Sequence, residues 1–306
     1  MTAGLPGWAI LHSFAVGGCR TGAGVPVVPC PGGYRAGPWG GRVPHWPPRP
    51  NKVKENVPDT LSFQQQHGIA TLSFDNPARR NALGSEELDA IEAGLTALDE
   101  TTRVLLITSS DDRIFCAGAD LSQILDGSLN GDRFQSVTDQ IANLPIPTVA
   151  VLTGNVFGGG AELALSCDFR LGREGLAMRI PAAAIGLCYP VAGIERLTRR
   201  LGIPLAKRLL VAAETFSAED MLALGLVDRV FPAAQLRSEA DSYAQSLLAL
   251  APMAVSSMLA IIRGLEVGAL DRAQAQSLAN ACAESEDVQE GILAQREKRA
   301  AHFKNR

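Results

Sequence analysis

The sequence predicts an α/β core followed by a helical region at the C-terminal end. Two near-continuous apolar runs, 103–109 (RVLLITS) and 147–153 (PTVAVLT), have the length and branched side chains of strands that are buried on both faces of a sheet. Helical patterns alternate with strands as far as about residue 233, and the chain beyond is nearly all helical. This order is typical of an α/β sheet with helices packed on it.

Length and charge indicate a protein with a large core and without nucleic-acid or membrane partners. The chain has 306 residues, 46% of them apolar, which is enough to bury a large core. Its net charge is −4, with acidic and basic residues interspersed, so we expect no nucleic-acid partner held by a general basic field. No apolar run reaches the roughly 18 residues of a membrane span, so we expect no membrane partner either.

The cysteines and histidines indicate a protein without disulfides or metal. The six cysteines form no CxxC pair, and the four histidines are isolated, so we predict neither a disulfide framework nor a metal site. Reduced thiols favour a cytoplasmic protein. The weakly apolar segment Trp8–Val16 follows no basic region, so a secretory signal is not expected. Cys116 is expected to be a small buried hydrophobe rather than a nucleophile.

Residues 1–58 differ from the rest of the chain. They hold ten of the 18 prolines and all three tryptophans, and they show no apolar periodicity. Such a segment buries too little surface to offset its ordering entropy, so we predict a disordered extension. The alternative, a proline-rich recognition arm, has no clear PxxP repeat to support it.

The core is expected over residues 59–233. It opens with a strand at 68–74 (GIATLSF), which Asn76 and Pro77 end. A helix follows from Ser85, its expected N-cap, to about Asp99, with apolar residues on one face. After the two buried strands we expect a helix near 160–167, strands at 169–172 and 176–180, helices between 191 and 224, and a closing strand at 226–231.

The C-terminal region is expected over residues 234–306. Its helices lie near 234–249, 252–267, 271–283 and 285–299. Several of them are apolar over much of their circumference. Such helices need partners, from the same chain or from another subunit, so we predict a role in self-association.

Two glycine-containing turns follow two of the predicted strands. They are 115–120 (FCAGAD) and 154–163 (GNVFGGGAEL). Successive glycines before a helix let the backbone approach a ligand closely, and the helix supplies unpaired N–H groups with a positive dipole end. The two turns therefore predict a backbone oxyanion hole, which would stabilise a developing negative oxygen.

Other known functions of glycine-rich turns are excluded by the residues around them. Neither turn has the Lys-Ser or Lys-Thr of a P-loop, the G-x-G-x-x-G of a dinucleotide site, or a G-x-S-x-G nucleophile elbow. A purely structural turn remains an alternative. Glu162, taken singly, fits the common role of an acidic residue in the first turn of a helix.

The combination of motifs is more specific than either turn. Five groups occur in a fixed order: Asn76-Pro77 with 81–83, then 115–120, then 158–164 with Cys167-Asp168, then 218–220 with 223–227, and finally 297–299. Over roughly residues 61–306 this order resembles the crotonase superfamily, also called the enoyl-CoA hydratase/isomerase family. The resemblance implies a crotonase-like spiral of repeated ββα units with a C-terminal oligomerisation region. Residues 1–58 have no counterpart in it.

The resemblance implies a ligand and roles for individual residues. The ligand would be an acyl-coenzyme A thioester, whose carbonyl accepts hydrogen bonds from the N–H groups of Ala119 and Gly159. Glu162 would be the catalytic acid/base. No cofactor is implied, because coenzyme A is part of the substrate. The residues expected beside coenzyme A are Arg79, Arg80, Ala82, Ala117, Asp120 and Lys298.

Further implications concern assembly and the acyl pocket. Members of the family usually assemble as trimers or as pairs of trimers, and Lys298 matches a position that is sometimes reached from a neighbouring subunit. Arg79 and Arg80 suit phosphate groups, although an ordinary solvated role fits them equally. The segment Asp126–Phe134 is expected to be a mobile loop bordering the acyl pocket.

The sequence departs from the family pattern around residues 181–197. Typical hydratases of the family place a second glutamate in a Pro-Glu pair, and here the pair is Pro181-Ala182. Alanine transfers no proton. In the glycine-rich turn that follows, Tyr189 adds bulk and Pro190 has no N–H. Ala182, Tyr189 and Pro190 are all expected in the acyl pocket. Glu195 could supply a second acid, but a surface or salt-bridge role beside Arg196 is the simpler expectation.

Two functions remain open from the sequence. The first is an enzyme that hydrates an enoyl-CoA or shifts its double bond, with Glu162 as the only acid/base. The second is an acyl-CoA-binding protein with little or no turnover. A general scaffold without a thioester ligand would leave the two glycine turns unexplained.

Overall fold

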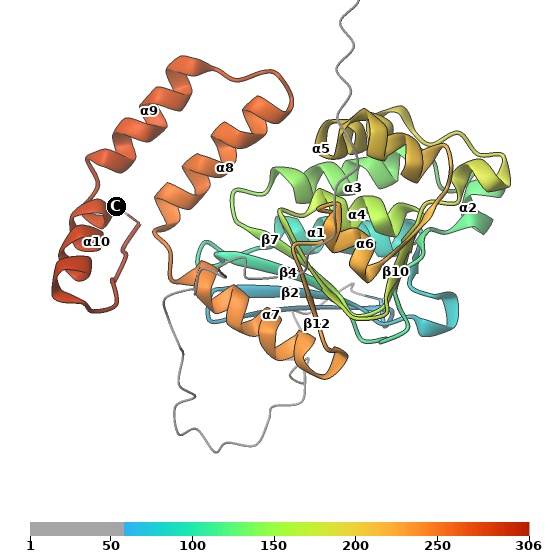
Figure 1. Ribbon diagram of the computed structural model, residues 1–306, viewed down its shortest axis with the longest axis horizontal. Helices are drawn as coiled ribbons and strands as arrows, with labels where there is room; N and C mark the ends of the chain where they lie inside the picture. Colours follow the sequence, from blue (N-terminus) through green and yellow to red (C-terminus); the bar gives the residue numbers. More distant parts are fainter. Residues whose placement is uncertain (1–57, 306) are drawn as a thin grey trace, which may run out of the picture. The chain divides into compact units, whose positions relative to one another are not determined.

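The computed structural model describes residues 58–305 (Figure 1). The predicted extension over residues 1–58 therefore lies outside the described part, apart from Pro58. The predicted core lies within it, and so does the predicted C-terminal region except for Arg306. Strands and helices alternate as far as β12, and four helices follow, as the sequence pattern predicts.

The larger sheet has six strands in the order β1-β2-β4-β7-β9-β12. β1 and β2 pair antiparallel, and the other neighbours pair parallel. The two predicted buried strands, β4 and β7, lie at its centre with every residue buried. The strand bounds are β1 Leu61–Gln66, β2 Ile69–Phe74, β4 Val104–Ser109, β7 Thr148–Leu152, β9 Phe169–Arg173 and β12 Arg229–Phe231.

Two smaller sheets stand beside the larger one. The first has the order β11-β10-β8-β5, and the second pairs β3 with β6. Successive strands β4 and β5, β7 and β8, and β9 and β10 each contribute one strand to the six-stranded sheet and one to the four-stranded sheet. The bounds are β3 Ala82–Leu83, β5 Ile114–Cys116, β6 Gly118–Ala119, β8 Asn155–Phe157, β10 Ala177–Arg179 and β11 Thr215–Ser217.

Helices cover both faces of the six-stranded sheet. Figure 1 shows α7 on one side of β2 and β4, and α1, α3 and α4 on the other. The main apolar core lies between the sheets and this second group of helices, and a smaller core lies under α7. The helices of the core are α1 Ser85–Thr96, α2 Leu121–Leu125, α3 Gly131–Asn143, α4 Gly159–Ser166, α5 Val191–Leu210 and α6 Ala218–Ala223, with short 3-10 helices η1 Pro77–Arg79 and η2 Ala182–Ile185.

The C-terminal helices follow β12 as expected. They are α7 Ala233–Leu248, α8 Pro252–Glu266, α9 Arg272–Ala283 and α10 Glu286–Glu297. Figure 1 shows α8 and α9 side by side, beyond α7. Within residues 58–305 no individual helix has the length and hydropathy to cross a membrane; only α7 and α8 taken together do, and they meet at a bend of 100°.

The structure corrects several details. Gly84, not Ser85, is the N-cap of α1, and Ser85 is already helical. The segment Asp126–Phe134 is not one loop, because α3 begins at Gly131 and buries Phe134. Strand β1 was not predicted from the sequence. Its LSFQQQ sequence lacks a continuous apolar run because only one of its faces packs on the core.

Candidate active site

One pocket lies where the two glycine turns, α3 and the start of α5 meet. It has a volume of about 120 Å³ and a largely apolar wall. Its lining residues come from β5–α2, the start of α3, the start of α4, η2 and the two residues before α5. They are Ala117, Ala119, Leu121, Ile124, Asn130, Gly131, Phe134, Gln135, Gly158, Gly159, Glu162, Pro181, Ala182, Ile185, Leu187, Tyr189 and Pro190.

The two glycine turns pack backbone against backbone. A Cβ atom at Gly118 would lie 2.3 Å from the backbone nitrogen of Gly159, and one at Gly160 would lie 2.3 Å from the carbonyl oxygen of Cys116. Gly118 also has a φ of +91°, which L-residues with a side chain rarely adopt. Glycine is therefore required at both positions, and its use brings Ala119 and Gly159 together at the pocket wall.

The N–H groups of Ala119 and Gly159 are not directed at ladder or helix partners. Asp120 donates its N–H to the Leu83 carbonyl at 2.9 Å, across the β3–β6 pair. Since successive groups along a strand point to opposite sides, the N–H of Ala119 points away from β3. Gly159 is the first residue of α4, whose first N–H groups have no partner within the helix.

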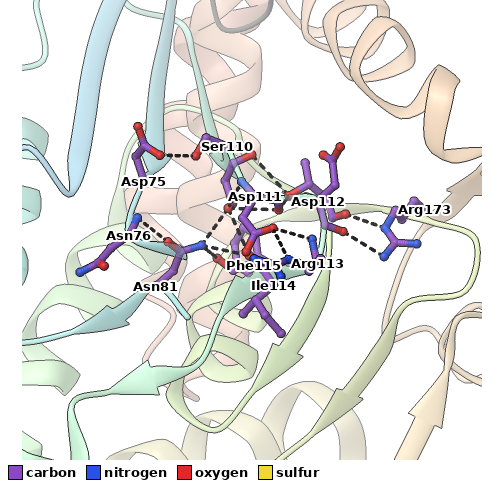
Figure 2. A network of polar contacts seen from close by, with 12 residues as sticks. Asp75, Asn76, Asn81, Ser110, Asp111, Asp112, Arg113, Ile114, Phe115 and Arg173 are labelled. Atoms are coloured by element: carbon purple, nitrogen blue, oxygen red, sulfur yellow. Dashed lines mark hydrogen bonds and ion pairs between the residues drawn. The ribbon is translucent and has the colours of Figure 1, made fainter. Parts of the chain in front are cut away.

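Asn81 anchors the first glycine turn (Figure 2). Its side-chain Nδ2 donates to the carbonyl oxygens of Ile114 and Phe115, at 3.0 and 3.1 Å. Its Oδ1 accepts from the backbone N–H of Asn76 at 2.7 Å. Asn81 is buried, and its φ of +54° lies in the left-handed region that asparagine tolerates. The asparagine of the 81–83 motif thus ties the strand before the turn to the loop after β2.

Glu162 is the only acidic residue among those that line the pocket, and it is fully buried. Its Oε2 accepts from the Tyr189 hydroxyl at 2.7 Å and from Nε2 of Gln135 at 3.0 Å. Its Oε1 accepts from the Arg196 guanidinium at 2.7 Å. Three donors from α3, α5 and the segment before α5 therefore hold one carboxylate.

Burial and hydrogen bonding act in opposite directions on Glu162. Burial raises its pKa above the ordinary value, and the hydrogen bonds from Tyr189 and Gln135 oppose that rise. The adjacent guanidinium of Arg196 also favours the charged form. Burial lowers the pKa of Arg196 to about 10, so this arginine still carries its charge at neutral pH. Desolvation thus favours the neutral form of Glu162, while the hydrogen bonds and the charge of Arg196 favour the ionised form.

Arg196 links Glu162 to α3. The same guanidinium group donates to the Thr138 hydroxyl at 2.7 Å and forms an ion pair with Asp139. Glu195 has the expected surface role, although its salt-bridge partner is Arg199 and not Arg196. Glu195 is exposed and pairs with Arg199 one turn along α5, at 2.8 Å, and it does not line the pocket. It offers no second acid to the pocket.

The predicted residues around the pocket divide into two groups. Those that line it are Ala117, Ala119, Gly159, Glu162, Ala182, Tyr189 and Pro190. The others lie beside it or apart from it. Arg79 is exposed and forms an ion pair with the buried Asp120, the N-cap of α2, while Arg80 is exposed and Ala82 lies in β3.

Asp120 and Lys298 occupy very different positions. Burial alone would raise the pKa of Asp120, but hydrogen bonds from Ser122 and the charge of Arg79 bring it below its ordinary value. Lys298 ends α10, which packs on α9, and the pocket lining extends in sequence only from Ala117 to Pro190. The structure therefore does not bring Lys298 to the pocket of its own chain. Its predicted contact from a neighbouring subunit stays a prediction.

Phe134 belongs to the segment that was expected to border the pocket, and it covers Gly159, where a Cβ atom would lie 2.6 Å from its ring. Three residues of the site were not predicted. They are Gln135, Arg196 and Gly193, which lies against the Glu162 carboxylate. A signal for α3 exists in the sequence, since its buried residues Phe134, Val137, Thr138 and Ile141 repeat at helical spacing.

Cys116 is buried, as predicted, and burial raises the pKa of its thiol to about 12.

Known proteins resemble this chain over most of its length. Among curated relatives, enoyl-CoA hydratase domain-containing protein 2, mitochondrial, of Bos taurus is 36% identical over 77% of this chain and 84% of its own. Methylglutaconyl-CoA hydratase, mitochondrial, of Mus musculus is 32% identical over 79% of this chain and 81% of its own. Short-chain-enoyl-CoA hydratase of Clostridium acetobutylicum is 30% identical over 81% and 99%.

Solved structures and a family model agree with these relatives. The crystal structure of enoyl-CoA hydratase from Bacillus anthracis matches with a TM-score of 0.73 and 26% identity, over 81% of this chain and all of its own. An enoyl-CoA hydratase/isomerase family member matches with a TM-score of 0.73 and 30% identity, over 80% and 97%. The model described as enoyl-CoA hydratase/isomerase matches residues 64–306. The chain therefore belongs to the enoyl-CoA hydratase/isomerase family, the crotonase superfamily.

Proposed function

We propose that this protein binds an acyl-coenzyme A thioester and transfers a proton next to its carbonyl group, hydrating an enoyl-CoA or shifting its double bond. The strongest support is the pocket itself, where Ala119, Gly159 and the buried Glu162 line the same apolar space. Hydratase relatives of the same family support a reaction of this kind.

The N–H groups of Ala119 and Gly159 form the oxyanion hole in this proposal. Removing a proton beside a thioester moves negative charge onto the carbonyl oxygen. Fixed backbone donors stabilise that charge without rearranging, and the loss of one such donor typically costs about 3 kcal/mol in the barrier. The tight packing of Gly118 on Gly159 keeps both donors in place.

Glu162 accepts the proton and returns it. Ala182 lines the same pocket and transfers none, so the reaction depends on one carboxylate. Ala182, Tyr189 and Pro190 form the wall around the acyl chain. General acid–base catalysis contributes roughly 10²–10⁴-fold, so hydration with one carboxylate would be slower than with two. Shifting a double bond requires only removal and return of a proton.

Coenzyme A is part of the substrate, and we propose no further cofactor. Arg79 and Arg80 are exposed at the end of η1 and suit its phosphate groups, with Ala82, Ala117 and Asp120 beside them. Lys298 would reach the ligand from a neighbouring subunit of a trimer or a dimer of trimers. A cytoplasmic location stays part of the proposal, although two of the relatives above are named mitochondrial proteins.

The test is turnover of a panel of thioesters by the wild-type protein and Glu162→Gln. The panel contains crotonyl-CoA, longer 2-enoyl-CoAs and the matching 3-enoyl-CoAs, with products separated by chromatography. Because glutamine accepts no proton, we expect kcat to fall by about 100-fold or more, while the Kd for a saturated acyl-CoA changes little.

Glu195→Gln is the matched control. It removes one negative charge from the exposed face of α5, outside the pocket, and should leave both kcat and Kd as they are. Turnover that is equal in the wild-type protein and Glu162→Gln would show that Glu162 does not carry the proton.

A second function is an acyl-CoA-binding protein with little turnover. It is favoured by the three donors that hold Glu162 and by alanine at position 182. Calorimetry that measures tight binding of acyl-CoA, together with no product from any thioester of the panel, would support it. A clear catalytic rate would exclude it.

A further inference from the structure

Oxygen Oε2 of Glu162 is already fully bonded. Oε2 accepts from Tyr189 and Gln135, and both of these residues line the pocket. Oε1 accepts from Arg196, which lies outside the pocket lining. A carboxylate oxygen has two lone-pair sites, so Oε2 has no site left with which to take a proton from a ligand.

The other side of the carboxylate is closed by α5. A Cβ atom on Gly193 would lie 2.9 Å from Oε2 and 3.0 Å from Oε1 of Glu162. The backbone of α5 therefore lies against the carboxylate, and Glu162 has no exposed surface. Neither a water molecule nor a ligand carbon reaches the carboxylate from this side without moving the helix.

Tyr189 lines the pocket and bonds directly to the carboxylate of Glu162. Its hydroxyl gives its own proton to Glu162 at 2.7 Å, so the acceptor capacity of the phenol oxygen remains available to a ligand. Burial and the charge of Glu162 raise the pKa of Tyr189 well above its ordinary value, so the hydroxyl is protonated before a ligand binds.

We propose that Tyr189 is a catalytic residue that relays protons between the acyl chain and Glu162. This inference rests on the proposed function and adds the group through which the proton passes. As the bond between carbon and hydrogen breaks beside the thioester, its proton moves to the Tyr189 oxygen. The Tyr189 proton moves at the same time to Oε2 of Glu162, and the electron pair moves to the thioester carbonyl oxygen.

The return step reverses the relay at another carbon. Tyr189 gives its proton to the acyl chain two carbons further along, takes one back from Glu162, and the electron pair returns from the carbonyl oxygen to form the shifted double bond. Atoms and charge balance without a water molecule. The relay thus explains how one carboxylate that is enclosed by donors can serve isomerisation of a 3-enoyl-CoA to a 2-enoyl-CoA.

Tyr189→Phe tests the relay, because it removes only the hydroxyl and keeps the ring in place. We expect kcat for the conversion of but-3-enoyl-CoA into crotonyl-CoA to fall by about 100-fold or more, with little change in the Kd for butyryl-CoA. If Glu162 instead took the proton directly, Tyr189→Phe would free one site on Oε2. The kcat of Tyr189→Phe would then equal or exceed that of the wild-type protein, and this result would overturn the relay.

Tyr243→Phe is the matched hydroxyl deletion. Tyr243 packs edge-on against Phe169 with ring centroids 5.5 Å apart, and it does not line the pocket. Its kcat should not change, and thermal melts of both variants check their folding. Should Tyr189→Phe fold poorly, the solvent isotope effect on wild-type kcat decides. The relay moves the exchangeable Tyr189 proton and predicts slower turnover in D₂O, whereas an unchanged rate would overturn it.

Failure of the relay differs from failure of the proposed function. If Glu162→Gln abolishes turnover and Tyr189→Phe does not, Glu162 is the base and only the relay is wrong. If Glu162→Gln keeps full turnover, both are wrong.

Discussion

Glu162 owes its chemistry to neighbours that are distant in sequence. Gln135 and Arg196 lie 27 and 34 residues away and reach it from α3 and α5. The sequence identifies Glu162 as a candidate only through the order of motifs that resembles the family, because an acidic residue in the first turn of a helix is common in itself. It does not identify Gln135 or Arg196, because a helical pattern gives the buried face but not the partner that this face meets.

The pH dependence of turnover tests whether Glu162 must be ionised for the reaction. Glu162 must be ionised to accept a proton, so kcat/KM should fall as the pH drops through its pKa. Since burial raises that pKa, the fall should begin above the ordinary glutamate value of about 4.3. Arg196→Met removes the charge that favours ionisation, so the fall should move to higher pH in a pH–rate profile.

Arg196→Met should also destabilise the fold. Removing one partner of a buried ion pair typically costs about 3–5 kcal/mol, which urea unfolding measures. Arg199→Met is the control, since Arg199 forms the exposed pair with Glu195 on the same helix. An unchanged pH profile in Arg196→Met would contradict the role given to Arg196.

At the scale of elements, the site depends on two turns that only glycine allows. The sequence predicts the turns, and it predicts β4 and β7, because runs that are buried on both faces are apolar throughout. It does not predict β11, a three-residue strand that is defined only by its pairing with β10. Short strands of this kind take their structure from tertiary partners rather than from local pattern.

Gly118→Ala tests the contact between the turns. The added Cβ would meet the backbone nitrogen of Gly159, so the two turns must move apart. A displacement of about 1 Å at a catalytic site can cost about 100-fold in rate, and we expect a kcat loss of that order. The left-handed backbone adds about 1–2 kcal/mol of destabilisation.

Gly268→Ala separates the loss of kcat from the loss of stability. Gly268 also has a positive φ, +67°, but a Cβ there would meet nothing within 4 Å. It should lose stability to a similar extent and keep its kcat. If Gly118→Ala kept full turnover, the close packing of the turns would not matter for catalysis.

At the scale of the whole molecule, the C-terminal helices present an apolar face. Met258, Ile262 and Leu265 lie on one side of α8 and are 55%, 58% and 59% exposed. The sequence indicates this property, because helices that are apolar around much of their circumference require a partner. It cannot indicate which surface supplies that partner, since the surface belongs to another element or another chain.

We expect this face to be buried by self-association. Light scattering of the wild-type protein should give a mass of three or six chains, and the double variant Ile262→Glu with Leu265→Glu should give a smaller mass, because two charges would have to be buried. Gln276→Glu, which adds a charge to the exposed surface of α9, should leave the mass unchanged. A wild-type mass of one chain at every concentration would contradict the expectation.

In the proposed site, the amides of Ala119 and Gly159 hold a thioester oxygen beside Glu162. A crystal structure with butyryl-CoA, which has no double bond to react, tests this arrangement. We predict the thioester oxygen at about 2.7–3.1 Å from both backbone nitrogens, with the acyl chain between Glu162 and Ala182. A thioester oxygen bonded elsewhere, or an acyl chain outside this pocket, would contradict this arrangement.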